Sequence, residues 1–169
     1  TKFYPAAKAL NYSLDVKTRL VLKAKSVIGK KRLKFDAGWV DLALGVPLLD
    51  TTNPLGPNFT FDAGAGGESA AERLQSLAPE MRVVKVFNTT GANNMANPRY
   101  GDAGVTMLYA GDDAGAKKIA STLAAALGFE PVDAGPLVRA RELEHLAMLW
   151  ISLAFGGMGR EIAFKLMKR

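Results

Sequence analysis

The sequence predicts an α/β protein built on a doubly wound, parallel β-sheet. From residue 40 onward, short apolar or β-branched segments alternate with amphipathic segments, and the connections between them are short. Strand–helix alternation of this kind is typical of a parallel sheet covered by helices on both faces. The 169 residues fit one domain, with an atypical segment at 1–45, the sheet and its helices at 46–134, and a helical segment at 135–169.

The central part of the chain supplies the predicted strands and helices. The segment at 39–50, WVDLALGVPLLD, is almost continuously apolar, as one or two buried parallel strands require. A helix at 67–79 ends at Pro79, and a helix at 112–128 begins with an Asp cap and ends at Gly128. Further strands are predicted at 82–88, 105–111 and 129–135, with a polar loop at 89–101.

The two ends of the chain are less regular. Residues 136–169 predict one long helix, or two helices that meet at Gly156 and Gly157. Near the start, residues 6–14 favour a helix and residues 18–25 favour a strand.

Composition excludes several kinds of site. The chain has no cysteine and a single histidine, so disulfides, thiolate chemistry and His- or Cys-rich metal centres are excluded, and no metal site is predicted. The first ten residues lack the apolar core of a signal peptide. The longest apolar stretch, at 146–159, is too short and too rich in glycine to span a bilayer. We therefore expect a cytoplasmic protein without a membrane partner.

The positive charge is concentrated near the start of the chain. Residues 1–39 contain ten Lys or Arg and two Asp, so this segment carries +8 while the rest of the chain carries −2. The basic run at 17–34 is interpreted as a solvated face or as a contact for a nucleotide phosphate. Because it lacks interleaved aromatic residues and any nucleic-acid motif, a nucleic-acid partner is not expected.

Three loops follow predicted strands, at 50–57, 87–95 and 133–141. In a parallel sheet such loops emerge at one edge, where open α/β sheets bind their ligands. The first two loops carry neutral hydrogen-bonding side chains: Thr51, Thr52, Asn53, Asn88, Thr89, Thr90 and Asn93. These residues could instead cap helices and close turns, but two such clusters at one edge favour a ligand crevice.

The residue types at this edge indicate which chemistry the site could support. No Ser–His or carboxylate–histidine pair accompanies the loops, so no catalytic side chain is predicted, and a bound cofactor would carry the reaction. Hydride transfer fits this arrangement better than hydrolysis does. We interpret His145 as an ordinary helix residue and the Asp112–Asp113 pair as a helix cap.

Several segments from about residue 48 to the end of the chain resemble a known family. LLDTTNPLGP, RVVKVFNTTGANNMANPRY, TMLYAGDDAGAKKIASTLAAALGFEPVDAGPLVRARELEHLAMLWISLAF and GREIAFKLMKR are similar to the NADP oxidoreductase, coenzyme F420-dependent family. They also resemble the reductase domains of STEAP-type metalloreductases. The resemblance implies a Rossmann-like fold, commonly in a homodimer, that passes hydride between NADP(H) and a small-molecule redox acceptor, namely coenzyme F420, a flavin or a related compound.

The resemblance also assigns cofactor-binding residues. The nicotinamide end of NADP(H) would lie beside Pro47, Thr52, Asn53 and Pro54, while Asn88, Thr89 and Thr90 would position the carboxamide or the acceptor ring. Near the start of the chain, Lys23, Lys25 and Ser26 correspond to the place where the 2′-phosphate of NADP is held.

One expected motif is missing. The family begins with a strand and a G-x-G-x-x-G turn that binds pyrophosphate, but before Ala43 this chain has only Gly29 and Gly38. The alternative hypothesis is therefore a non-catalytic Rossmann-like module for dimerisation or regulation, with weakened dinucleotide binding.

Overall fold

A computed structural model describes residues 12–15, 21–24, 30–35, 38–43, 46–57, 60–62 and 66–169. A four-stranded sheet forms its centre, with strand order β10-β9-β6-β5. These strands are β5 (Pro47–Asp50), β6 (Arg82–Val86), β9 (Thr106–Gly111) and β10 (Glu130–Gly135). Two of the three strand pairings are parallel, β5 with β6 and β9 with β10. The α/β, Rossmann-like architecture predicted from the sequence is confirmed.

The central pairing differs from the all-parallel expectation. Strand β9 runs antiparallel to β6, with Val84 opposite Gly111 and Val86 opposite Tyr109. The carboxyl ends of β5 and β6 therefore lie at one edge of the sheet, and those of β9 and β10 lie at the other. We call these the β5/β6 edge and the β9/β10 edge.

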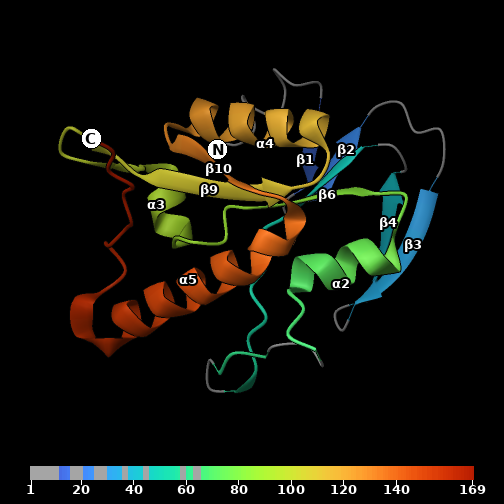
Figure 1. Cartoon of the computed structure of the whole chain (residues 1–169), viewed down its shortest axis with the longest axis horizontal. Helices are drawn as coiled ribbons and strands as arrows, with labels where there is room; N and C mark the ends of the chain where they lie inside the picture. The colour runs from blue at the N-terminus through green and yellow to red at the C-terminus, as the bar shows by residue number, and fades with distance from the viewer. Residues whose placement is uncertain are drawn as a thin grey trace.

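Helices cover both faces of the sheet (Figure 1). Helix α4 (Ala114–Leu127) lies on one face, while α2 (Ala70–Leu77) and α5 (Ala140–Leu153) lie on the other. Side chains alternate along β6: Val84 and Val86 belong to a core cluster with α4, whereas Val83 packs in a second cluster with α2 and the start of α5. Lys85 shares the second face with Val83.

Local signals explain the helix boundaries. Helix α2 starts at Ser69, whose side chain forms a capping box with Glu72. In α4 the Asp113 side chain accepts from the backbone amide of Ala116 at 2.7 Å, and Gly128 ends the helix with φ of 97°. These features confirm the helices predicted at 67–79 and 112–128. The cap interpretation of the Asp pair is confirmed for Asp113, whereas Asp112 Oδ1 accepts from the backbone amide of Leu137 at 2.8 Å.

The segment at 89–101 is more structured than the predicted loop. It contains the short helix α3 (Ala92–Ala96) and strand β7 (Arg99–Tyr100), which pairs with β8 (Ala103–Gly104).

The carboxyl-terminal segment also corrects the prediction. After the 3₁₀ turn η2 (Leu137–Arg139), helix α5 ends in one π-helical turn, η3 (Ala154–Met158). Residues 159–169 are not helical. Gly157 and Gly159 have φ values of 117° and 75°, which stop the helix. The following backbone contacts the sheet instead, because the amide of Thr106 donates to the carbonyl of Phe164 at 3.2 Å.

Toward the start of the chain the described strands form two antiparallel hairpins. Strand β1 (Tyr12–Asp15) pairs with β2 (Val21–Ala24), and β3 (Lys30–Phe35) pairs with β4 (Gly38–Ala43). The strand expected at 18–25 is present in part. The helix expected at 6–14 is wrong from Tyr12 onward, and its first residues lie outside the described part. The apolar segment at 39–50 forms parts of two strands, β4 and β5.

Candidate functional site

The first two predicted loops meet at the β5/β6 edge. Asn53 Nδ2 donates to the backbone carbonyl of Asn88 at 3.0 Å, and Asn88 Nδ2 donates to Asn53 Oδ1 at 3.0 Å. Asn88 Nδ2 also donates to the carbonyl of Leu143 in α5, again at 3.0 Å. The convergence predicted from parallel β5 and β6 is therefore present, and α5 joins it.

The third loop lies elsewhere. Because β9 and β10 run against β6, residues 133–141 begin at the β9/β10 edge. Arg139 there pairs with Glu142 at 2.8 Å, and Arg141 reaches Glu72 of α2. The expectation that all three loops share one edge is therefore wrong for this one.

Turn chemistry fixes the loop after β5. Asp50 Oδ1 accepts hydrogen bonds from the backbone amide of Thr52 at 3.0 Å and from its hydroxyl at 2.7 Å. Thr52 is exposed, and Pro54 is buried. Pro47 is buried at the opposite end of β5, where it pairs with Arg82. Thr52, Asn53 and Pro54 thus share a loop, but Pro47 does not lie beside it.

The loop after β6 begins with an unusual backbone conformation. Phe87 has φ of 63°, in the left-handed region that side chains other than glycine seldom adopt. Its ring is 2% exposed and packs 6.2 Å, centroid to centroid, from that of Phe129. The turn directs the chain into Asn88 and Thr89, which are both buried.

Helix α3 and the chain end engage the rest of this loop. The Thr90 hydroxyl accepts from Asn94 Nδ2 at 2.8 Å, and that amide also donates to the carbonyl of Ile162 at 2.7 Å. The indole of Trp150 donates to the same carbonyl at 2.7 Å. Gly91 is closely surrounded, since an added Cβ would lie 2.6 Å from Trp150 Cη2. The second loop is therefore held firmly.

Two buried oxygens near this edge have no hydrogen-bond partner, Oδ1 of Asn88 and Oδ1 of Asn93. Buried acceptors are normally satisfied, so each exception needs an explanation. A ligand amide would satisfy Asn88 Oδ1, and the nicotinamide carboxamide of NADP(H) carries that donor. This acceptor is therefore of the kind that a carboxamide donor satisfies, although the oxygen is closed to solvent in the structure.

Sequence reasoning missed a buried group of charges beside these loops. Lys85 Nζ contacts Asp50 Oδ2 at 2.8 Å, the carbonyl of Thr52 at 2.6 Å and Glu144 Oε1 at 2.7 Å. Both oxygens of Glu144 also accept from the backbone amide of Ala70, at the start of α2. The side chains of Lys85 and Glu144 are fully buried. We call Lys85, Asp50 and Glu144 the buried ion cluster.

Carboxylates of the chain itself occupy the amino end of α2. Arg141 binds Glu72 through two hydrogen bonds of 2.8 Å, and Glu72 in turn contacts Ser69. The hydrogen bonds from Arg141, together with those from Ser69, lower the pKa of Glu72 to about 2, against the opposing effect of burial. Glu144 also accepts from the backbone amide of Ala70. The partial positive charge at the amino end of α2 is therefore already balanced by two carboxylates of the chain itself.

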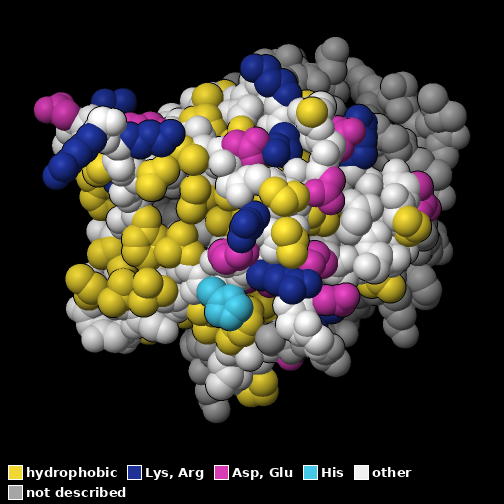
Figure 2. Space-filling model, viewed as in Figure 1, with side chains coloured by type: hydrophobic (Ala, Val, Ile, Leu, Met, Phe, Trp, Pro, Cys, Tyr) yellow, Lys and Arg dark blue, Asp and Glu magenta, His cyan; other side chains and the backbone are white. Residues whose placement is uncertain are grey.

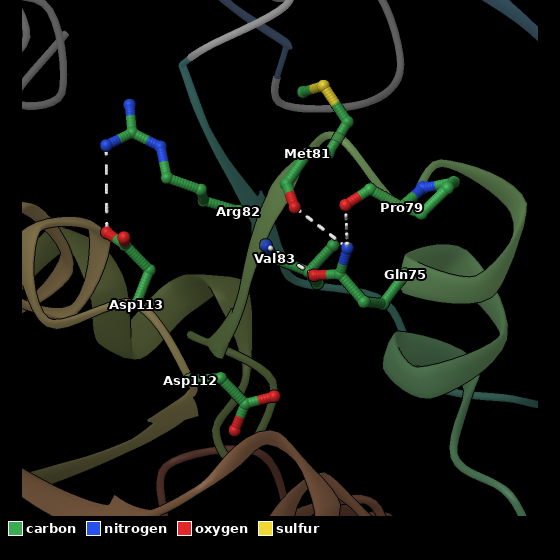
Figure 3. A pocket seen from close by; sticks show the side chains of 7 residues that line it. All are labelled: Gln75, Pro79, Met81, Arg82, Val83, Asp112 and Asp113. Carbon is green, nitrogen blue, oxygen red and sulfur yellow. Dashed lines mark hydrogen bonds and ion pairs between the residues drawn. The ribbon is translucent and has the colours of Figure 1, made fainter.

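A pocket of about 350 Å³ lies at the other end of the sheet (Figure 3). Arg82 Nη1 lies 3.7 Å from Asp113 Oδ1 at its rim. The pocket is lined by Gln75, Pro79, Met81, Arg82, Val83, Asp112 and Asp113. These residues include none of the predicted cofactor contacts.

The remaining predicted residues have local roles or lie outside the described part. His145 Nδ1 lies 2.7 Å from the carbonyl of Arg141, one helical turn earlier, and its exposed ring packs against Phe61. Lys23 lies in β2, opposite Ser13. Lys25 and Ser26 fall outside the described residues, so the phosphate contact stays a prediction. The described residues contain no group of three or more potential metal-ligating side chains.

Comparisons with known proteins support the predicted resemblance. No family model matches the chain. It is 38% identical over 109 residues, 64% of its length, to the metalloreductase STEAP3 of Rattus norvegicus. It is also 33% identical over 69 residues, 40% of its length, to the terminase ATPase subunit of Escherichia phage P2. These matches span 21% and 12% of those proteins.

Solved structures resemble the fold as well. A candidate F420-dependent NADP reductase from Arthrobacter sp. FB24 superposes with a TM-score of 0.67 at 32% identity, over 74% of this chain and 59% of that one. A hypothetical protein from Sinorhizobium meliloti gives a TM-score of 0.51 at 31% identity, over 56% of this chain and 47% of that one. The chain is therefore similar in sequence and fold to a candidate F420-dependent NADP reductase and similar in sequence to a metalloreductase, and the resemblance predicted from its motifs is confirmed.

Proposed function

We propose that this chain is the dinucleotide-binding part of an NADP(H)-linked oxidoreductase, with the nicotinamide end at the β5/β6 edge. The observation that carries the proposal is the meeting of the loops after β5 and β6, where Asn53 and Asn88 are hydrogen-bonded and Asn88 Oδ1 is buried without a partner. The similarity to an NADP reductase and a metalloreductase supports it.

In this proposal the protein acts by placing two reactants. NADP(H) would supply or take up the hydride, with coenzyme F420, a flavin or a related compound as the acceptor. Asn88 Oδ1 would accept from the carboxamide, while the loop that carries Thr52 and Asn53 would line the ring. Holding two reactants in a fixed relative orientation removes much of the entropic barrier. No side chain is assigned as a proton donor.

Titration with NADPH tests the proposal. We expect nicotinamide fluorescence to saturate in the micromolar range, and Asn88→Leu to abolish this change while the circular dichroism spectrum is kept. The matched control is Asn97→Leu, an exposed asparagine just beyond α3, which should bind as the unaltered protein does. Absence of binding at millimolar NADPH would contradict the proposal.

The alternative is a non-catalytic module with the same fold. Two observations favour it: the chain lacks a G-x-G-x-x-G turn, and the side-chain amide of Asn53 is already used within the protein. Charge-assisted bonds to a phosphate contribute about 1.5–3 kcal/mol each, so losing several weakens binding by orders of magnitude. Failure of the NADPH titration would support this alternative.

A homodimer is the expected assembly. Hydrophobic side chains gather over the carboxyl-terminal end of α5 (Figure 2), where Leu149, Phe155 and Met158 are 50%, 62% and 63% exposed. Apolar surface of this kind often marks an interface. Sedimentation should give a dimer that dissociates on Phe155→Ser, while the matched change Leu77→Ser, at an exposed leucine of α2, should leave it intact.

Localisation and other partners remain predictions. In the described part of the chain, no helix combines the length and the apolar character needed to cross a bilayer. We propose a cytoplasmic protein that does not bind nucleic acid. If residues 17–34 did bind DNA, its retention would fall steeply as salt is raised.

A further inference from the structure

The buried ion cluster has no assigned role in the proposed reaction. Lys85 is 0% exposed and lies on the strand face that packs against α2 and α5. Replacing a buried ion pair by well-packed apolar residues is often neutral or even stabilising. Stability alone therefore does not explain a lysine on this face of β6, where its neighbour Val83 belongs to an apolar cluster.

The geometry of the cluster joins separate segments of the chain. An ammonium group has three donors, and Lys85 directs them at three acceptors: the Asp50 carboxylate ending β5, the Thr52 carbonyl in the following loop, and the Glu144 carboxylate in α5. Glu144 extends the connection to the amide of Ala70 in α2. One side chain thus fixes the loop after β5 relative to α5.

The candidate site spans the same two segments. The side-chain amide of Asn88 donates to Asn53 and to the carbonyl of Leu143. These two residues are the direct sequence neighbours of Thr52 and Glu144, which Lys85 contacts. Lys85 and Asn88 therefore hold the same pair of segments, one from within the core and one at the sheet edge. A shift of either segment would change the direction of Asn88 Oδ1.

We propose that Lys85 is a positioning residue of the dinucleotide site. It holds the Thr52–Asn53 loop and α5 in a fixed relative position, so that Asn53 and Asn88 face the nicotinamide ring in one defined orientation. The role in binding rests on the proposed function. The role in loop geometry can be measured without any ligand.

Two variants test this role. Lys85→Met removes the connection, and Glu144→Gln keeps the shape of the side chain but removes one charge, so it serves if the first variant does not fold. The matched control is Lys117→Met. Lys117 binds Asp133 at 2.8 Å and the carbonyl of Gly135 at 3.3 Å, so it also joins a carboxylate to a backbone carbonyl, but at the β9/β10 edge.

The first measurement is the NMR spectrum of the side-chain amides of Asn53 and Asn88 in the ligand-free protein. Lys85→Met or Glu144→Gln should shift or broaden these signals, and Lys117→Met should leave them unchanged. Unchanged signals in a folded Lys85→Met or Glu144→Gln protein would overturn the proposal. This result does not depend on whether the protein binds NADPH.

The second measurement is NADPH affinity at a temperature where circular dichroism shows each variant to be folded. A positioning role predicts affinity weakened at least about tenfold by either cluster variant and unchanged by Lys117→Met. A purely structural role would lower the melting temperature without changing the affinity of folded protein, and that outcome would overturn the proposal. If the unaltered protein bound no NADPH, the proposed function would fail, and the amide signals would still decide the loop geometry.

Discussion

The two edges of the sheet use similar charged groups in opposite surroundings. At the β5/β6 edge, Lys85 is fully buried and its three contacts are 2.6–2.8 Å long. At the β9/β10 edge, the side chains of Lys117 and Asp133 are 19% and 45% exposed, and an open pocket lies nearby. Interactions between charges are strong where water is excluded and weak where it is present. We therefore expect the stability of the fold to depend strongly on the charged contacts at the β5/β6 edge and only weakly on those at the β9/β10 edge.

The largest expected difference concerns the two lysines. Lys85→Met leaves Asp50 and Glu144 as uncompensated buried carboxylates, so the free energy of unfolding should fall by about 3–5 kcal/mol. Lys117→Met removes a pair in contact with water and should cost at most about 1 kcal/mol. Urea denaturation measures both. Equal losses in the free energy of unfolding would show that burial does not make the Lys85 contacts more important for stability than the Lys117 contacts.

Glycine substitutions give the next largest contrast. A Cβ at Gly91 would lie 2.5 Å from Asn93 Oδ1 and 2.6 Å from the Trp150 ring, so Gly91→Ala should destabilise by about 1–3 kcal/mol. At Gly115 of α4 the nearest atom, Asp113 Oδ1, would be 3.2 Å away. There the better helix propensity of alanine, up to about 1 kcal/mol, offsets the tighter contact. Thermal unfolding of both variants should separate them; a Gly91→Ala protein as stable as Gly115→Ala would contradict the close packing.

The smallest expected effect is a pH dependence at the start of α2. Because the pKa of Glu72 is lowered from 4.5 to about 2, this carboxylate stabilises the fold fully above about pH 5. That contribution is lost as pH falls toward 2. In Glu72→Gln the urea midpoint should therefore decrease less between pH 5 and pH 2 than in the unaltered protein.

The control for this pH effect is Glu142→Gln. Arg139 also lowers the pKa of Glu142, but both side chains are more than half exposed. The pH dependence should accordingly change less in this variant. An equal change in the two variants would show that the Glu72–Arg141 contact contributes no more to the pH dependence of stability than the exposed Glu142–Arg139 contact does.

Much of the fold could be predicted because its local signals agree with its packing. The β-branched run at 82–86 and the capped helix at 114–127 needed no long-range information. Predicting the direction of β9 required long-range information, because residues 87–105 are long enough to return the chain either parallel or antiparallel to β6. The amphipathic pattern after Gly159 predicted a helix, but backbone contacts with Thr106 hold this segment against the sheet instead.

The candidate site could be predicted only where it depended on strand direction. Parallel β5 and β6 were enough to bring Asn53 and Asn88 together. The role of Lys85 could not be found, because a lysine in a strand usually indicates a solvent-facing position. Its partner Glu144 is 59 residues away in the chain, and the helical pattern of α5 does not distinguish a buried glutamate from an exposed one.

In the proposed site, the left-handed turn at Phe87 links the position of Asn88 to the packing of the hydrophobic core. Its ring is anchored beside Phe129, while its backbone sets the direction in which Asn88 leaves β6. A conformation of this kind persists only while the surrounding packing enforces it. On warming, loss of packing near Phe129 would relax this turn, so we expect the proposed nucleotide affinity to fall before the sheet unfolds.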